Sequence, residues 1–177
     1  MAPQPSDMHG SWPDNRGSMS VSFAALRPTL ATSGPLPKGD GWSYEPKWDG
    51  FRGMAFVDGT ERVLSRRGND LTYLCPVVEQ LRTLELDPAV FDGEIVALRD
   101  GVHSFEGLQS AMRRRSSESV AFIVFDVLWL RGTSLVDRPY VERRAVLEEF
   151  EFPDGISLTP RFDDGDALFT AVLQVET

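Results

Sequence analysis

A lysine placed between two carboxylates is the feature of the sequence best suited to covalent chemistry. Lys47 stands in the run Glu45-Pro46-Lys47-Trp48-Asp49-Gly50-Phe51-Arg52. A lysine attacks an electrophilic phosphorus atom only as the neutral amine. Because its reference pKa is roughly 10.4, its surroundings must lower that value through burial or nearby cations. Arg52 and a metal-bound nucleotide could supply such cations, and Gly50 would let the backbone approach a ligand closely. We therefore expect Lys47 to act as a nucleophile.

Three later segments carry further residues that suit nucleotide chemistry. Arg66 lies in a basic turn, Ser65-Arg66-Arg67-Gly68-Asn69-Asp70. Glu94 follows a glycine in Phe91-Asp92-Gly93-Glu94, where a strand could aim its carboxylate at a hydroxyl group. Phe125 begins Phe125-Asp126-Val127-Leu128, and stacking of such a ring on a nucleobase contributes roughly 1–3 kcal/mol. Each pattern alone also fits an ordinary turn, edge strand or core aromatic, so the interpretation depends on their order.

In this order the four segments resemble the motifs of the covalent nucleotidyltransferases, which comprise ATP-dependent DNA ligases, RNA ligases and mRNA capping enzymes. The nucleophile pattern Lys-x-Asp-Gly-x-Arg is matched by Lys47, Asp49, Gly50 and Arg52. The flanking segments are similar to those of bacterial DNA ligases of the repair and end-joining type. These segments are Leu26 to Pro37, Ser104-Phe105 with Leu108-Gln109, and Arg138-Pro139 with Arg143-Arg144 and Leu147. The resemblance covers about residues 23–174.

The resemblance implies a three-step reaction. Lys47 would attack the α-phosphorus of ATP, release pyrophosphate and become lysyl-AMP; AMP would pass to the 5′-phosphate of a DNA nick, and the 3′-hydroxyl would displace it. ATP and Mg²⁺ (or Mn²⁺) are the implied cofactors, because a divalent metal neutralises phosphate charge. Nicked double-stranded DNA is the implied substrate, and DNA end-joining or repair proteins are candidate partners.

The resemblance also assigns a role to each site residue. Glu45 would lie beside the adenine, and Phe125 would stack on it. Arg52 would contact the ribose or the nick phosphate, and Arg66 would contact phosphate. Glu94 would bind the ribose or the metal.

Two other readings of the same motifs remain open. An RNA ligase or a capping guanylyltransferase would share the nucleophile, and labelling by GTP in place of ATP, or action on RNA ends, would separate it from a DNA ligase. A catalytically dead relic or a binding module would keep the nucleotide pocket without the reaction.

Part of the family pattern is missing from the sequence. The family continues with a Glu-Gly-apolar-apolar-x-Lys strand and a Lys-x-Lys strand, and neither follows Asp166. Lys38 and Lys47 are the only lysines, and an OB-fold domain is also absent. Fewer cations around the phosphates mean less electrostatic stabilisation of the transfer. We therefore expect a C-terminally truncated domain with weak or absent ligation by this polypeptide alone.

The composition says more about the cellular location of the protein than about its function. The net charge of the 177 residues is −9, and residues 145–177 hold eight acids against Arg161, so bulk charge neither supports nor excludes a nucleic-acid substrate. One cysteine, Cys75, excludes an internal disulfide, and two histidines are too few for a zinc site. With no apolar run long enough for a bilayer and no secretion signal, we expect a bacterial cytoplasmic protein near the nucleoid and away from membranes.

Hydrophobic patterning predicts the elements that hold these residues. Residues 1–22 read as a flexible tail, and 23–177 as the N-terminal part of a DNA ligase adenylation domain. We expect an α+β fold, with a mainly antiparallel sheet and flanking helices, which the resemblance describes as an incomplete ATP-grasp-like nucleotidyltransferase domain. The expected strands are Phe51–Val57, Arg62–Ser65, Val90–Leu98, Val120–Leu130 and Ile156–Thr159. The expected helices are Leu74–Leu86, Ser104–Met112, Arg138–Phe150 and Asp166–Gln174.

Overall fold

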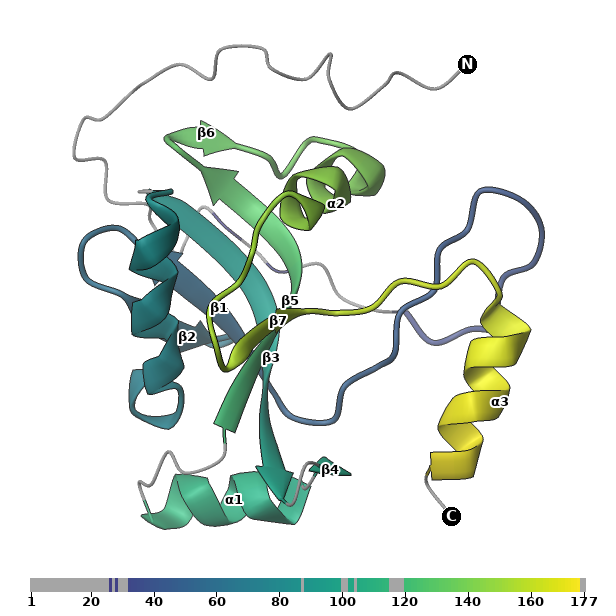
Figure 1. The fold of residues 1–177 in the computed structure, drawn as a ribbon, viewed down its shortest axis with the longest axis horizontal. Coiled ribbons are helices and arrows are strands. Elements are labelled where there is room, and N and C mark those ends of the chain that lie inside the picture. Colours follow the sequence, from purple (N-terminus) through teal and green to yellow (C-terminus); the bar gives the residue numbers. More distant parts are fainter. Residues whose placement is uncertain are drawn as a thin grey trace.

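A twisted sheet with helices around it forms the part of the chain that the computed structural model describes, namely residues 26, 28, 32–86, 88–99, 102–103, 105–114 and 120–175. The strand order is β2-β1-β3-β5-β6, with β4 paired to β3 and β7 paired to β5 (Figure 1). Every pair is antiparallel except β5 with β7. The strands are β1 (Phe51–Val57), β2 (Arg62–Ser65), β3 (Ala89–Arg99), β4 (Val102–His103), β5 (Val120–Leu130), β6 (Thr133–Ser134) and β7 (Ile156–Leu158).

The helices are the 3-10 helices η3 (Thr72–Leu74) and η4 (Pro76–Leu84) and the α-helices α1 (Phe105–Arg114), α2 (Tyr140–Glu148) and α3 (Gly165–Val175). The predicted α+β class, mainly antiparallel sheet and flanking helices are confirmed. The tail predicted at residues 1–22 and Ser104, where a predicted helix begins, lie outside the described residues. Among the described residues, no helix combines the length and apolar character needed to cross a membrane.

The structure differs from the prediction of one helix over Leu74–Leu86. It forms η3 and η4, which are separated by Cys75 with φ −133°, and η4 ends at Glu85 with φ +51°. Pro76 starts η4, and the β-branched Val77 and Val78 that follow favour an α-helix only weakly. A three-residue repeat lets Val78 and Leu81 face the sheet together, and both are fully buried.

A tight turn that the prediction missed adds β6 to β5. Arg131 has φ +48° and Gly132 has φ +82°, and they connect the paired residues Leu130 and Thr133. Positive φ at both central positions is the signature of a two-residue hairpin turn that matches the twist of the strands. An arginine at the first of these positions is uncommon, so the residue types at this turn do not predict a hairpin.

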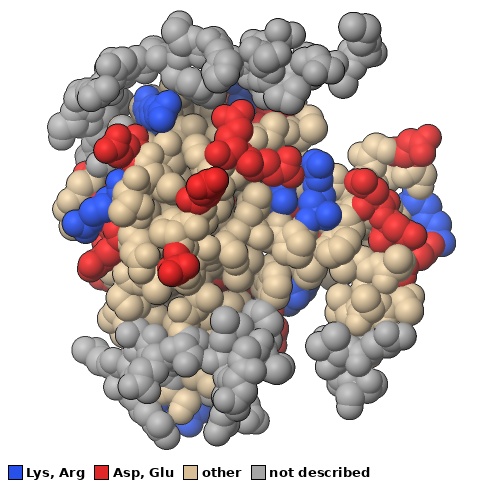
Figure 2. All heavy atoms as spheres, in the orientation of Figure 1, with Lys and Arg blue, Asp and Glu red and all other residues tan. Residues whose placement is uncertain are grey.

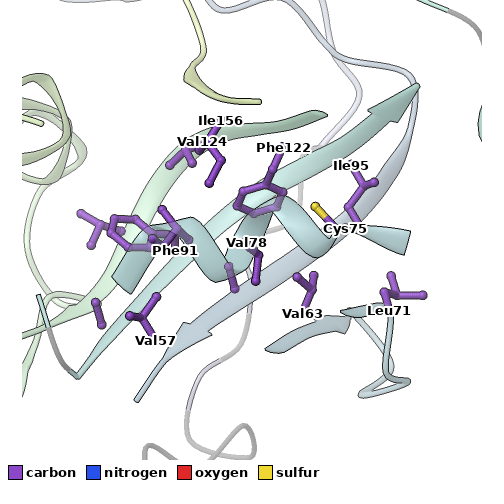
Figure 3. Close-up of a cluster of buried hydrophobic side chains, with 14 of the residues drawn as sticks. Val57, Val63, Leu71, Cys75, Val78, Phe91, Ile95, Phe122, Val124 and Ile156 are labelled. Atoms are coloured by element: carbon purple, nitrogen blue, oxygen red, sulfur yellow. The ribbon is translucent and has the colours of Figure 1, made fainter. Parts of the chain in front are cut away.

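The main core lies on one face of the sheet, under η4 and α2. Figure 3 shows apolar side chains of β1, β3 and β5 meeting those of η4. Phe91 and Phe122 are fully buried in it, and the rings of Phe150 and Phe152 pack edge-on against Phe91. This layer fixes the sheet, so the opposite face is free to carry polar groups.

Two bulges in β5 shape that opposite face. Asp92 pairs with Asp126 while Gly93 pairs with Val124, so Phe125 is an extra residue in the ladder. A second shift between Val90 and Phe91 adds another extra residue further along β5. A bulge leaves one residue unpaired and re-aims the side chains on either side of it. As a result Phe125 and Asp126, although adjacent, both reach the polar groups of β1 and β3.

Residues 38–44, in the segment before β1, run beside α3 (Figure 1). Tyr44 pairs with Phe162 through two backbone hydrogen bonds of 2.9 Å, and Lys38 lies 3.3 Å from Asp166. A side chain on Gly165 would collide with the ring of Tyr44. Figure 1 shows α3 standing beside this segment, away from the helices that cover the core.

Candidate active site

Arg52 lies at the centre of a polar cluster built from β1, β3 and β5. Its Nε donates to Oδ1 of Asp92 at 2.9 Å and its Nη2 donates to Oδ2 at 2.6 Å. Its guanidinium carbon is 5.2 Å from the centroid of the Phe125 ring. Glu94 is the direct cross-strand partner of Arg52. Three predicted site residues, Arg52, Glu94 and Phe125, therefore share one site.

Lys47 approaches this cluster from the loop that precedes β1. Its side chain is exposed, and its positive charge acts on the Glu94 carboxylate. The backbone N–H of Gly50 donates to the same carboxylate. A side chain on Gly50 would collide with the carbonyl oxygen of Ile95, so only glycine lets the loop pass this close to β3. The structure thus brings the predicted nucleophile to the predicted carboxylate.

Glu94 titrates near neutral pH in this setting. Burial raises its pKa from 4.5 to about 7, while the charges of Lys47 and Arg52 oppose the rise. Burial also raises the pKa of Asp92, against the opposing hydrogen bonds from Arg52. A buried carboxylate near its titration point can accept a hydrogen bond when ionised and donate one when protonated.

Asp126 extends the cluster toward α2. It is 8% exposed, and Arg143 donates two hydrogen bonds of 2.7 and 2.8 Å to its carboxylate. Its charge acts on Arg52 and on Asp92. Three cations (Lys47, Arg52, Arg143) therefore face three carboxylates (Asp92, Glu94, Asp126). The cluster is formally neutral when all its groups are ionised, so a triphosphate would need additional positive charge.

Glu45 lies two residues before Lys47, and its hydrogen bonds go to residues outside the cluster around Arg52. Its Oε1 accepts from the hydroxyl of Tyr140 at 2.6 Å and from Nη1 of Arg144 at 2.9 Å. Burial raises its pKa, and both of these partners oppose the rise. Glu45 also lines a cavity of about 800 Å³ that neither Lys47 nor Phe125 lines. Its predicted place beside the adenine therefore remains a prediction.

Arg66 lies at the tip of the turn that follows β2. Ser65 closes this turn by donating its N–H to Asn69 at 2.8 Å, and the Arg66 side chain is exposed. Among the described contacts, no hydrogen bond or ion pair joins Arg66 to the cluster around Arg52. Its neighbour Ser65 pairs with Gly53 of β1, which places the turn beside the strand that carries Arg52.

Several functional candidates were present in the quoted motifs without a role assigned to them. Asp92, Asp126, Arg143 and Arg144 all stand in those segments, and Thr159 closes the last predicted strand. One signal for the two aspartates was available. A carboxylate within an apolar strand is buried only when it is paired, so each required a basic partner from elsewhere in the chain. Spacing alone does not say which arginine that partner is.

The donor set near Lys47 suits a hard cation held mainly by phosphate. Asp92 and Asp126 are each occupied by an arginine, which leaves Glu94 as the carboxylate best placed to contribute a ligand. Mg²⁺ is commonly bound through one or two carboxylates together with substrate phosphates and water. Among the described residues, no group of three or more His, Cys, Asp or Glu side chains could hold a metal by itself.

On the face shown in Figure 2, the described residues give no strong electrostatic sign of a partner. Figure 2 shows acidic side chains gathered over α2 and near the start of α3, with basic side chains interspersed on the same face. A nucleic-acid face usually carries a continuous basic patch. Of the described residues on this face, none forms such a patch, so the function rests on the site.

Comparison with known proteins identifies the family. Residues 27–161 match the family model of the ATP dependent DNA ligase domain. The chain is 39% identical over 143 residues to the multifunctional non-homologous end joining protein LigD of Mycolicibacterium smegmatis. The aligned region covers 76% of this chain and 18% of that protein. The chain is 36% identical over 154 residues to the LigD protein of Pseudomonas aeruginosa, covering 82% and 18%.

A solved structure extends this similarity to the fold. The mycobacterial DNA ligase D complexed with ATP and MES superimposes with a TM-score of 0.70 at 32% identity, over 88% of this chain and 53% of that one. The fold and the family match define an α+β domain of the ligase class. The chain belongs to the ATP dependent DNA ligase domain family. It spans about half of the solved ligase domain and less than a fifth of the LigD relatives.

Proposed function

We propose that this chain carries the nucleophile of an ATP-dependent DNA ligase, and that Lys47 takes AMP from ATP. The convergence of Lys47, Arg52, Glu94 and Phe125, which come from three separate segments of the sequence, is the observation that carries the proposal. Family membership supports ATP as the substrate, and a similar protein has been solved in complex with ATP.

In the proposed first step, Nζ of Lys47 attacks the α-phosphorus as the neutral amine. The bond from phosphorus to the bridging oxygen of pyrophosphate breaks, a phosphoramidate forms, and Nζ gives up a proton. Phe125 would stack on the adenine, and Glu94 would accept a hydrogen bond from the ribose or hold the metal. A divalent cation such as Mg²⁺ or Mn²⁺ would supply the positive charge that the neutral cluster lacks.

In the proposed later steps, AMP passes to the 5′-phosphate of nicked double-stranded DNA and the 3′-hydroxyl displaces it. The names of the LigD relatives support a role in DNA end joining, and thus end-joining or repair proteins as partners in the bacterial cytoplasm, at the nucleoid. Arg66, exposed on its turn, would contact a phosphate. Because the arginines of the cluster are already paired with carboxylates, we expect weak or absent sealing by this polypeptide alone.

The test measures covalent labelling by α-labelled ATP with Mg²⁺. The chain has two lysines, which gives a matched pair of variants: Lys47→Ala should abolish acid-labile labelling, and Lys38→Ala should leave it unchanged. Lys38 is exposed, and its amine pairs with the exposed Asp166 at 3.3 Å. Labelling that survives Lys47→Ala would overturn the proposal. Parallel reactions with GTP, and with RNA ends in place of a DNA nick, separate a DNA ligase from a capping enzyme and from an RNA ligase.

A further inference from the structure

Thr159 is a buried residue that holds the segment around Lys47 from both sides. It directly follows β7 and is 1% exposed. Its Oγ1 accepts the indole Nε1–H of Trp48 at 2.9 Å, and its carbonyl oxygen accepts Nη2 of Arg144 at 2.8 Å. Arg144 also donates to Glu45 at 2.9 Å. Thr159 thus binds Trp48, which follows Lys47, directly. Through Arg144 it also binds Glu45, which lies two residues before Lys47.

The same residue is fixed to the strand that carries the aromatic ring. The N–H of Thr159 donates to the carbonyl oxygen of Val124 at 2.8 Å, and Val124 immediately precedes Phe125. The parallel pairing of β7 with β5 ends at Val124, so this bond continues the ladder by one residue. Thr159 therefore joins the Lys47 segment to the strand of Phe125.

Each of the two anchors, Arg144 and Trp48, is held by further contacts. Arg144 is 4% exposed, and its charge is shared between Glu45 and Glu148, which lies 2.8 Å from its Nε. The indole of Trp48 packs against the apolar patch of Val96, Ala121 and Ile123. Hydrogen bonds in such buried places are costly to break, because each freed donor or acceptor stays desolvated. Since the Lys47 side chain is itself exposed, its position depends on these neighbours.

We propose that Thr159 is a positioning residue for Lys47, acting through Trp48 and through Arg144 and Glu45. It does not touch the reacting atoms. It holds the loop so that the Lys47 amine keeps a fixed place relative to β5 and the ring of Phe125. This inference rests on the proposed nucleophilic role of Lys47, and its consequence is that loosening Thr159 slows adenylation more than it weakens ATP binding.

The first test reads the order of the loop and needs no activity. Thr159→Val keeps the shape and the backbone bonds but removes the acceptor, and Thr159→Ser restores it. By NMR, we expect exchange of the Trp48 indole proton to quicken about tenfold in Thr159→Val and to recover in Thr159→Ser. Thr72→Val is the matched control, because the Thr72 hydroxyl accepts from Val63 at 3.0 Å beside η3. Unchanged exchange in Thr159→Val overturns the inference.

The second test reads the rate of lysyl-AMP formation. At saturating ATP we expect about a tenfold lower rate constant in Thr159→Val, with the KM for ATP changed less than about twofold. Trp48→Phe removes the donor from the other side and serves if Thr159→Val does not fold. The double variant should be no slower than the slower single variant, because both remove the same bond. Additive losses overturn the inference.

The two proposals fail in different ways. Absence of labelling at Lys47 in the unchanged protein contradicts the proposed function, and the exchange measurement then decides the role of Thr159 in holding the loop. Normal labelling with an unaltered rate in Thr159→Val contradicts the inference alone.

Discussion

The guanidinium group of Arg52 lies over the ring of Phe125, with 5.2 Å between its central carbon and the ring centroid. Two hydrogen bonds to Asp92 hold the guanidinium in that place. One face of the ring is therefore occupied by a cation, which is attracted to the aromatic quadrupole. A purine that stacks on Phe125 must use the opposite face or displace the guanidinium.

The pair formed by Arg52 and Asp92 leads to a prediction about Asp92→Asn. The neutral amide cannot accept both guanidinium hydrogen bonds, so a partly buried charge loses its partner. We expect the free energy of unfolding to fall by about 2 kcal/mol, and adenylation to slow because Arg52 no longer stays over Phe125. Urea unfolding and the rate of lysyl-AMP formation measure the two effects.

Asp58→Asn is the matched control for that variant. Asp58 forms a similar two-bond contact with Arg62, at 3.0 and 2.9 Å, but a larger part of this pair is exposed. Exposed ion pairs contribute roughly 0–1 kcal/mol, so Asp58→Asn should cost little stability and leave adenylation unchanged. Equal effects of the two variants on adenylation would show that the Asp92 pair has no special role.

The strands were predictable because their signals are local. The strands Phe51–Val57 and Arg62–Ser65 have the bounds that their residue patterns predict, and a turn around Gly59 with φ +89° separates them. Family motifs also placed Arg52, Glu94 and Phe125 at one site. These features depend on neighbours in the sequence or on a pattern that survives in short motifs.

The bulges of β5 and the pairing of buried charges were not predictable in the same way. Strict alternation would put Phe125 and Asp126 on opposite faces, and the extra residue in the ladder arises from the register with β3. Likewise, spacing alone does not say which arginines pair with Asp92 and Asp126, and the choice depends on where α2 packs. The anchoring role of Thr159 depends on contacts more than a hundred residues apart, such as its bond to Trp48.

The raised pKa of Glu94 predicts how Glu94→Gln changes stability with pH. The folded protein holds this proton more tightly than the unfolded chain, since the pKa rises from 4.5 to about 7. The stability that Glu94 contributes is therefore complete below pH 4.5 and is lost as the pH rises through 7. Glutamine avoids this loss, so we expect Glu94→Gln to be more stable than the unchanged protein at pH 8 by about 1 kcal/mol, after allowance for solvent screening.

Urea unfolding at pH 4 and pH 8 checks that expectation. The difference between Glu94→Gln and the unchanged protein should nearly vanish at pH 4, where both side chains are neutral. The exposed Glu79 provides the control, because Glu79→Gln should show no comparable pH-dependent gain. A gain of equal size at both pH values would contradict the assignment to Glu94 ionisation.

The close packing around Gly50 predicts that a side chain at this position lowers activity. A methyl group there would meet the carbonyl oxygen of Ile95, which belongs to the backbone of β3 and cannot move aside. Gly50→Ala should push the loop away from Glu94 and lower the rate of lysyl-AMP formation by about tenfold or more. Gly34→Ala is the control, because its added methyl group meets nothing within 4 Å. Labelling of Gly50→Ala at the unchanged rate would show that the loop does not need this close approach.

The proposed stacking role of Phe125 predicts that its replacement changes the KM for ATP more than the maximal rate of adenylation. Phe125→Leu keeps an apolar group on the bulge but removes the flat ring, and base stacking on such a ring contributes roughly 1–3 kcal/mol. We expect the KM for ATP to rise about tenfold in adenylation assays, while Phe125→Tyr stays close to the unchanged protein. Phe169→Leu serves as the control, since Phe169 is 58% exposed on α3. If Phe125→Leu lowers the maximal rate while the KM stays fixed, the ring acts by holding Arg52 rather than by binding the adenine.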